Sequence, residues 1–193
     1  MKINTITCHD VYNSGASLQA YALMKYLQEL GHDVKIIDYK PDYLSRHYKL
    51  GIVSNPKYEK NIILKIAYIL LKLPGRLWAL RRKKVFDHFR NDYLKITDTR
   101  YSSNEDLRSN LPEADLYIAG SDQIWNATFR NGKDGAFYLD FVPNNKIKAS
   151  YAASFATETF PKELKDKTSN MLKKFDYISV REKSGLDILE DMN

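Results

Sequence analysis

Residues 3–39 read INTITCHDVYNSGASLQAYALMKYLQELGHDVKIIDY, and this stretch decides the fold of the chain. Residues 3–8 are rich in β-branched side chains and bounded by polar ones, which predicts a strand. Apolar residues then recur at helical spacing from Leu18 to Leu30, and Gly31 occupies the position of a carboxyl cap. Residues 34–39 predict a second strand. A strand, a helix and a strand in this order form a βαβ unit, which predicts a parallel sheet.

The same alternation returns in the second half of the chain. Residues 114–119 predict a buried strand that ends at Gly120. Later strands and helices are expected at residues 147–154, 161–174, 177–180 and 182–189. We therefore expect an α/β fold in which residues 1–193 form one lobe, a Rossmann-like parallel sheet flanked by helices. Between the two halves, residues from about 44 to 110 predict a helical insertion with a break at residues 73–75.

Composition excludes several classes of protein. The chain has 193 residues, of which 44% are apolar, enough for one sizeable core. Its single cysteine, Cys8, excludes an internal disulfide framework, and no Cys/His spacing predicts a metal site. The first residues lack the features of a secretory signal. We therefore expect a cytoplasmic protein, with Cys8 buried in a strand rather than acting as a nucleophile.

Positive charge is concentrated in one segment. Residues 57–90 carry a net charge of +8, against +6 for the whole chain. The segment includes Leu64, Tyr68, Leu71, Leu77 and Trp78 together with Arg76, Arg81, Arg82, Lys83 and Lys84. One interpretation is a patch that binds an anionic membrane surface, and the other is a helix pair that packs on the core with a solvated basic face. The apolar part, residues 62–73, is too short to span a bilayer. No nucleic-acid-binding motif is present, so we expect no nucleic-acid partner.

Candidate site residues follow the predicted strands, because open parallel sheets bind ligands beyond the carboxyl ends of their strands. His9, Asn13, Ser14 and Gly15 follow the first strand. The amino terminus of the following helix favours a phosphate or carboxylate, although Ser14 can equally be a plain helix cap. His9 is either an acid/base group or a local hydrogen-bonding residue.

The segment from Gly120 to Asn126 is the most site-like in the chain. Gly120 lets the backbone approach a ligand, and Ser121 and Gln123 supply polar groups. Asp122 is a candidate general base and Trp125 a candidate platform for stacking a sugar. The alternative is that Ser121 or Asp122 caps a turn while Trp125 fills the core.

Two further candidates follow the later strands. Ser154 ends one strand, and Arg181 follows the next. Arg181 either clamps a carboxylate or phosphate or forms an ion pair with Glu182 or another carboxylate. Asp38 ends the second strand, where dinucleotide-binding proteins hold a ribose, but the preceding loop has one glycine instead of the G-x-G-x-x-G pattern. We therefore read Asp38 as a strand-end turn residue and expect no nicotinamide or flavin cofactor.

Parallel strands place all these turns on one rim. We expect the turns that contain Gly15, Asp122, Ser154 and Arg181 to lie together.

Several of these segments resemble, in order, the polysaccharide pyruvyl transferase family. They are residues 13–23 (NSGASLQAYAL), 31–34 (GHDV), 37–39 (IDY), 120–126 (GSDQIWN), 138–141 (YLDF), 151–155 (YAASF) and 178–185 (ISVREKSG). The resemblance covers nearly the whole chain except residues 44 to about 110.

The resemblance implies a fold and an activity. The family is similar to two-lobed GT-B-like glycosyltransferases, and its bacterial members transfer the enolpyruvyl unit of phosphoenolpyruvate to sugar hydroxyls as a ketal, for exopolysaccharide biosynthesis. The chain matches the first lobe, and we expect a second, carboxyl-terminal lobe outside it to hold most of the phosphoenolpyruvate-binding arginine and histidine residues. By this resemblance Asp122 or His9 activates the acceptor, Gln123 and Trp125 contact the sugar, and Arg181 with the Gly15 loop stabilises an anion.

Two other functions remain open from the sequence. One is the acceptor lobe of a sugar-nucleotide glycosyltransferase, which would share the architecture. The other is a non-catalytic basic module that binds glycan or nucleic acid, which predicts tight binding by this chain alone, with a steep salt dependence if the partner is nucleic acid.

Overall fold

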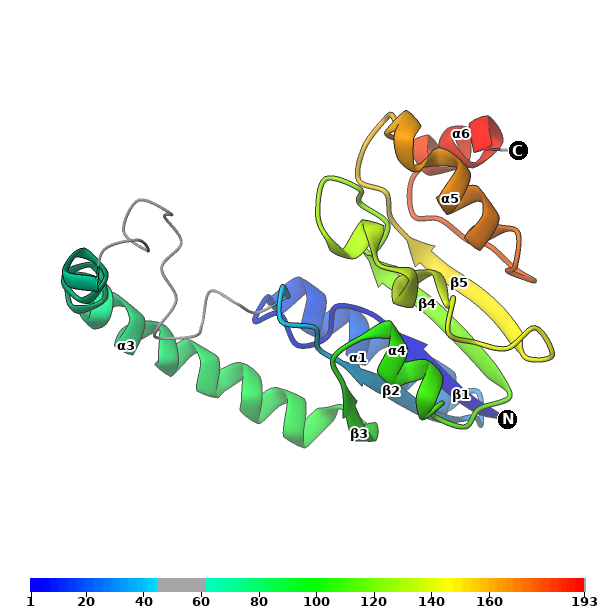
Figure 1. Ribbon diagram of the computed structural model, residues 1–193. Coiled ribbons are helices and arrows are strands. Elements are labelled where there is room, and N and C mark those ends of the chain that lie inside the picture. Colours follow the sequence, from blue (N-terminus) through cyan, green and yellow to red (C-terminus); the bar gives the residue numbers. More distant parts are fainter. Residues whose placement is uncertain (45–61, 193) are drawn as a thin grey trace.

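A parallel sheet forms the centre of the molecule. The computed structural model describes residues 1–44 and 62–192. Its strands are β1 (Lys2–Ile6), β2 (Asp33–Tyr39), β3 (Ile96–Tyr101), β4 (Leu116–Asp122) and β5 (Ile147–Ala153). They lie in the order β3-β2-β1-β4-β5, and every neighbouring pair is parallel (Figure 1). The predicted Rossmann-like α/β fold is confirmed.

Helices cover both faces of the sheet. They are α1 (Ser14–Glu29), α3 (Ile62–Tyr93), α4 (Asn104–Ser109), α5 (Lys162–Leu172) and α6 (Lys183–Met192), with the short 3₁₀ helices η2 (Asn131–Lys133) and η3 (Gly135–Tyr138). Ile3, Val34 and Ile36 pack against α1 on one face. Ile6, Ile37 and Tyr117 face the opposite way, in the core that α4, α5 and α6 cover. This alternation follows from the two-residue repeat of side chains along a strand.

The stretch predicted as a helical insertion contains more than helix, so that prediction is wrong at its carboxyl end. Residues 96–101 form the edge strand β3, and α4 follows it. Only Thr97 and Tyr101 of β3 are buried, so the strand carries little apolar pattern. Pairing with β2 decides its conformation instead. Residues 45–61 of the predicted insertion lie outside the described residues.

Helix α3 continues through the predicted break at residues 73–75. Pro74 lies inside the helix. Figure 1 shows the helix changing direction between its teal and green parts. A proline inside a helix removes one backbone N–H donor and kinks the helix, and α3 continues past Pro74. Among the helices that the structure describes, none is both long and apolar enough to cross a membrane.

The last predicted strand, residues 177–180, is not a regular strand but joins the sheet through two isolated bridges. Tyr177 bridges to Ala149 and Val180 bridges to Ala153, both in parallel orientation. The N–H of Arg181 donates to the carbonyl oxygen of Ala153 at 3.1 Å. These contacts carry Arg181 to the carboxyl end of β5, on the same rim as the ends of β1 and β4.

Candidate functional site

A cavity of about 760 Å³ lies where the chain order of the sheet reverses, between the carboxyl ends of β1 and β4. The loops after these two strands lead in opposite directions along the sheet, and such switch points form ligand crevices in open α/β folds. The cavity is lined by Cys8, Val11, Asn13, Gly15, Ala16, Gln19, Leu44, Ser121, Asp122, Gln123, Phe129, Asn131 and Arg181. The predicted rim is therefore real: Gly15, Asp122 and Arg181 line one cavity.

The amino terminus of α1 forms one wall. Asn13 is its N-cap, because its Oδ1 accepts a hydrogen bond from the N–H of Ala16 at 3.2 Å. Ser14 is instead the exposed first residue of the helix, so the alternative of Ser14 as the cap is wrong. Gly15 also lines this wall. The partial positive charge of the helix terminus thus borders the cavity.

Asp122 ends β4 and lies half-buried at the cavity wall. Its Oδ1 accepts a hydrogen bond from the N–H of Gln123 at 2.7 Å. Burial raises the pKa of Asp122 above its ordinary value, while that N–H and the positive charge of Arg181 act in the opposite direction. A raised carboxyl pKa brings the group closer to the pKa that a general base needs near neutral pH.

Gly120 permits close packing between neighbouring strands and does not contact a ligand site. Its φ is +123°, and a Cβ atom at this position would lie 2.2 Å from the carbonyl oxygen of Tyr151 on β5. Gly120 is buried and does not line the cavity. The prediction that this glycine lets the backbone approach a ligand is therefore wrong, because the close approach is to the neighbouring strand.

Arg181 presents an exposed positive charge to the cavity. It forms no ion pair with a carboxylate of residues 1–44 or 62–192, so the alternative of an ion pair with Glu182 is wrong there. The Glu182 carboxylate instead accepts hydrogen bonds from Ser154 Oγ, the N–H of Phe155 and the N–H of Ala156, at 2.9–3.1 Å. Glu182 is therefore engaged by the Ser154–Ala156 segment and not by Arg181.

Ser154 lies directly behind Asp122. Its N–H donates to the Asp122 carbonyl oxygen at 2.9 Å, and its side chain is buried against Glu182. Ser154 therefore supports the rim, and its hydroxyl does not line the cavity.

Trp125 belongs to the core. Its side chain has no exposed surface, its Nε1 donates to the carbonyl oxygen of Phe137 at 2.9 Å, and its ring stacks on Tyr138. The prediction of Trp125 as a sugar-stacking platform is wrong, because no ring face reaches the cavity.

His9 likewise lies in the interior, where its side chain has a hydrogen-bond partner. Its side chain is fully buried, with Nε2 at 3.3 Å from Asp38 Oδ1. The second Asp38 oxygen accepts hydrogen bonds from Arg90 of α3 and Arg100 of β3 at 3.0 and 2.9 Å. His9 therefore has a structural hydrogen-bonding role with a partner on the neighbouring strand β2, and it does not line the cavity as an acid/base group would.

The ion pairs of Asp38 tie α3 and β3 to the carboxyl end of β2. Burial acts to raise the pKa of Asp38, but hydrogen bonds from His9 and Arg100 and the charges of His9 and Arg90 lower it to about 2. The carboxylate is thus committed to its ion pairs, in agreement with a structural role for Asp38.

Gln19 is a cavity residue that the sequence analysis did not single out. Its Nε2 donates to Thr7 Oγ1 and to the carbonyl oxygen of Ala16, at 2.8 and 2.9 Å. Its Oε1 is buried and has no hydrogen-bond partner within the described part of the chain. The available signal was its position one helical turn after Gly15, on the same face of α1.

Asn131 and Cys8 also line the cavity. Asn131 Nδ2 donates to the carbonyl oxygen of Gln123 at 2.7 Å and so holds the loop after β4. Cys8 is buried, as predicted, although it lies just beyond β1 and not inside it. Burial raises the pKa of its thiol far above the ordinary value, with the charges of Asp122 and Asp134 adding to the effect. A thiol of this kind is a poor nucleophile.

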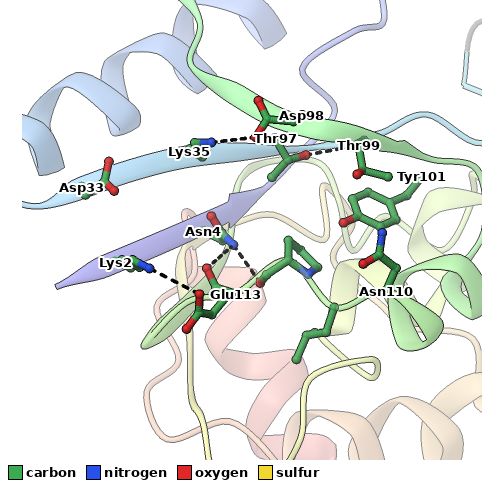
Figure 2. Close-up of a pocket in the computed structure, with 12 residues that line it drawn as sticks. Lys2, Asn4, Asp33, Lys35, Thr97, Asp98, Thr99, Tyr101, Asn110 and Glu113 are labelled. Carbon is green, nitrogen blue, oxygen red and sulfur yellow. Dashed lines mark hydrogen bonds and ion pairs between the residues drawn. The ribbon is translucent and has the colours of Figure 1, made fainter.

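A second cavity, of about 430 Å³, lies near the amino ends of the strands (Figure 2). Its lysines are paired, Lys2 with Glu113 at 3.3 Å and Lys35 with Asp98 at 3.1 Å. Asn4 is occupied as well, because its Nδ2 donates to the carbonyl oxygen of Pro112. The cavity at the carboxyl rim has a half-buried carboxyl group and an arginine without an ion pair among residues 1–44 and 62–192, and it is therefore the better candidate site.

Comparison with known proteins shows which sequence family the chain matches. Residues 13–193 match the sequence model of one family, described as polysaccharide pyruvyl transferase. No curated protein and no solved structure shows a significant match. The family match covers most of the chain, including the α1 wall, Asp122 and Arg181. The chain therefore belongs to the polysaccharide pyruvyl transferase family.

Proposed function

We propose that this chain supplies the acceptor-side lobe of a bacterial cytoplasmic enzyme that transfers a pyruvyl group from phosphoenolpyruvate to a sugar hydroxyl during surface polysaccharide biosynthesis. Family membership supports a transferase that acts on polysaccharide. The observation that carries the proposal is that one cavity is lined by a carboxyl group with a raised pKa, a helix amino terminus and an arginine that forms no ion pair within the described part of the chain. Its volume, about 760 Å³, lies within the range of small-ligand sites.

The proposed reaction needs three kinds of group. A base takes the proton from the attacking sugar hydroxyl, an acid delivers a proton to the methylene carbon of the enolpyruvyl unit, and a positive site stabilises the departing phosphate. Two sugar hydroxyls form bonds to the same carbon while its C–O bond to phosphate breaks; one hydroxyl proton is matched by the proton added to the methylene carbon, and the other leaves with the phosphate. In this chain Asp122 is the base, since His9 is buried away from the cavity.

Positive groups at the cavity stabilise the departing phosphate. Arg181 is exposed at the cavity, and the amino terminus of α1 adds its partial positive charge. In the intact enzyme these groups would complement the residues of the second lobe that hold phosphoenolpyruvate.

Sugar recognition is assigned to polar side chains of the same cavity. Gln19 lines the cavity wall, and Gln123 is exposed beside Asp122, so both can contact a sugar. These contacts replace the one first expected from Trp125.

Substitution of the base tests the proposal. Asp122→Asn in the full-length protein should lower acceptor-dependent transfer by about 10²- to 10⁴-fold, because the amide cannot take the proton. Phosphate release and pyruvyl incorporation into the acceptor should be measured together. Asp187→Asn, an exposed carboxyl group on α6, is the matched control. An unchanged rate for Asp122→Asn would remove Asp122 from the mechanism, and transfer from a sugar nucleotide instead of phosphoenolpyruvate would assign the cavity to a glycosyltransferase.

A further inference from the structure

Helix α3 carries a broad exposed apolar face. We define this face by Ile66, Leu70, Leu71, Leu77 and Trp78. Their exposed fractions run from 51% for Leu77 to 78% for Leu71. Isolated exposed apolar residues are normal on a protein surface, but five large ones within thirteen positions of a single helix indicate a binding surface.

The aromatic contacts between α3 and the rest of the described lobe lie in the carboxyl-terminal half of the helix. Phe89 contacts Tyr21 of α1 with ring centroids 6.0 Å apart, and Phe86 contacts Tyr12 at 6.2 Å. The amino-terminal half extends away from the sheet (Figure 1). The alternative of a helix pair whose apolar residues pack on the core is therefore wrong for the apolar face.

Basic residues follow the apolar face directly. Arg81, Arg82 and Lys84 are exposed, whereas Lys83 turns inward and binds Asp87. No aspartate or glutamate occurs from residue 60 to residue 86. The surface therefore combines apolar side chains with uncompensated positive charge.

The positive charge beside the apolar face distinguishes between three possible partners. A second copy of this chain would bring two such positive segments together, which like-charge repulsion opposes. Nucleic acid would satisfy the charge but leave the apolar face in water. An anionic bilayer satisfies both, because its headgroups attract arginine and lysine while its acyl boundary receives leucine, isoleucine and tryptophan.

We propose that the apolar face of α3, together with Arg81, Arg82 and Lys84, binds the surface of an anionic lipid bilayer. Binding would be peripheral, since α3 is not able to span a membrane. The proposal is independent of the reaction assigned to the cavity, which lies at the sheet rim.

Vesicle binding tests the contribution of charge. The full-length protein should co-sediment with phosphatidylcholine vesicles that contain phosphatidylglycerol and much less with phosphatidylcholine alone. The triple variant Arg81→Gln, Arg82→Gln, Lys84→Gln should reduce partitioning to the anionic vesicles by about 100-fold, because each basic residue near such a surface contributes about fivefold. The matched control, Lys25→Gln, Lys162→Gln, Lys173→Gln, changes the net charge equally at exposed positions elsewhere. Equal loss in both variants, or no preference for anionic vesicles, would overturn the proposal.

Fluorescence tests the contribution of the apolar face. The chain has two tryptophans, of which Trp78 is 71% exposed and Trp125 is fully buried. Anionic vesicles should shift the emission to shorter wavelength, brominated lipid should quench it, and Trp78→Phe should lose both effects. Binding without quenching of Trp78 would contradict the proposed orientation.

Sedimentation of the protein without lipid tests whether a second copy of the chain covers the apolar face instead. Leu71→Ser, Trp78→Ser should weaken vesicle binding without changing the oligomeric state of the wild type, and Leu186→Ser, exposed on α6, should change neither property. A wild-type dimer that only the double variant dissociates, with no binding to vesicles, would assign the face to a second copy and end the membrane proposal.

Discussion

Thr7 Oγ1 donates a hydrogen bond of 2.8 Å to the carbonyl oxygen of Ser121 and so joins the carboxyl ends of β1 and β4. The same oxygen accepts a hydrogen bond of 2.8 Å from Gln19 Nε2. One hydroxyl thus connects β1, α1 and β4 at the switch point of the sheet. The walls of the cavity depend on this connection.

Thr7→Val should loosen both walls at once. Valine keeps the shape of threonine but removes the hydroxyl, so the free energy of unfolding should fall by about 1–2 kcal/mol. The KM for the acceptor should rise because Gln19 loses its anchor. Urea unfolding and acceptor kinetics measure the two effects, with the exposed Thr159→Val as control. An unchanged KM would show that Gln19 does not position the acceptor.

The pH dependence of transfer should report Asp122. As the proposed base, Asp122 acts when it has lost its proton, so kcat/KM should increase as the pH rises through its raised pKa. Arg181 lowers that pKa, and Arg181→Gln should therefore move the acid limb to higher pH. Lys183→Gln, an exposed neighbour, should leave the limb in place. A limb that stays unmoved in Arg181→Gln would contradict the assignment of Asp122.

Stability should fall at acid pH through Asp38. Its folded-state pKa of about 2 lies below the ordinary value of 3.8, so the carboxylate stabilises the fold above pH 4 and loses that effect as the pH falls toward 2. The shift corresponds to about 2 kcal/mol. Urea midpoints measured from pH 6 to pH 2 should show this loss in the wild type and a smaller one in Asp38→Asn. The variant should also be less stable at neutral pH, because Arg90 and Arg100 lose their partner.

Gly120→Ala should severely destabilise the lobe. The new Cβ would lie 2.2 Å from the carbonyl oxygen of Tyr151, and a φ of +123° disfavours alanine. We expect a loss of about 3 kcal/mol or more. Gly75→Ala is the matched control, because a Cβ there meets nothing within 4 Å and alanine favours the helix. Thermal unfolding of both variants compares them directly, and equal melting temperatures would exclude the clash.

Cys8 should react slowly with alkylating reagents. Burial raises the pKa of its thiol, so very little thiolate forms at neutral pH, even though the residue lines the cavity. Iodoacetamide labelling should be slow in the folded protein and fast in urea. Rapid labelling of the folded protein would mean that the thiol is not in the environment described.

Much of the fold followed from the sequence because its signals are local. The alternation of strand and helix patterns in residues 3–39 and 114–189 requires parallel strands, and parallel strands place the turns with Gly15, Asp122 and Arg181 on one rim. Strand β3 was not predicted, because an edge strand with few buried residues has no strong local pattern. Its strand conformation depends on pairing with β2, which is a tertiary contact.

The sequence by itself determined the α/β alternation of residues 3–39 and 114–189, the sheet rim that carries the site, and the local excess of positive charge on the segment that includes α3. Only the tertiary structure decided which polar and aromatic residues of that rim face the cavity. Trp125 and His9 turn into the core and Gln19 turns toward the cavity, because each side chain is directed by partners far along the chain, such as Phe137 for Trp125 and Asp38 for His9. Burial and hydrogen bonding depend on these distant partners, which no local pattern of residues encodes.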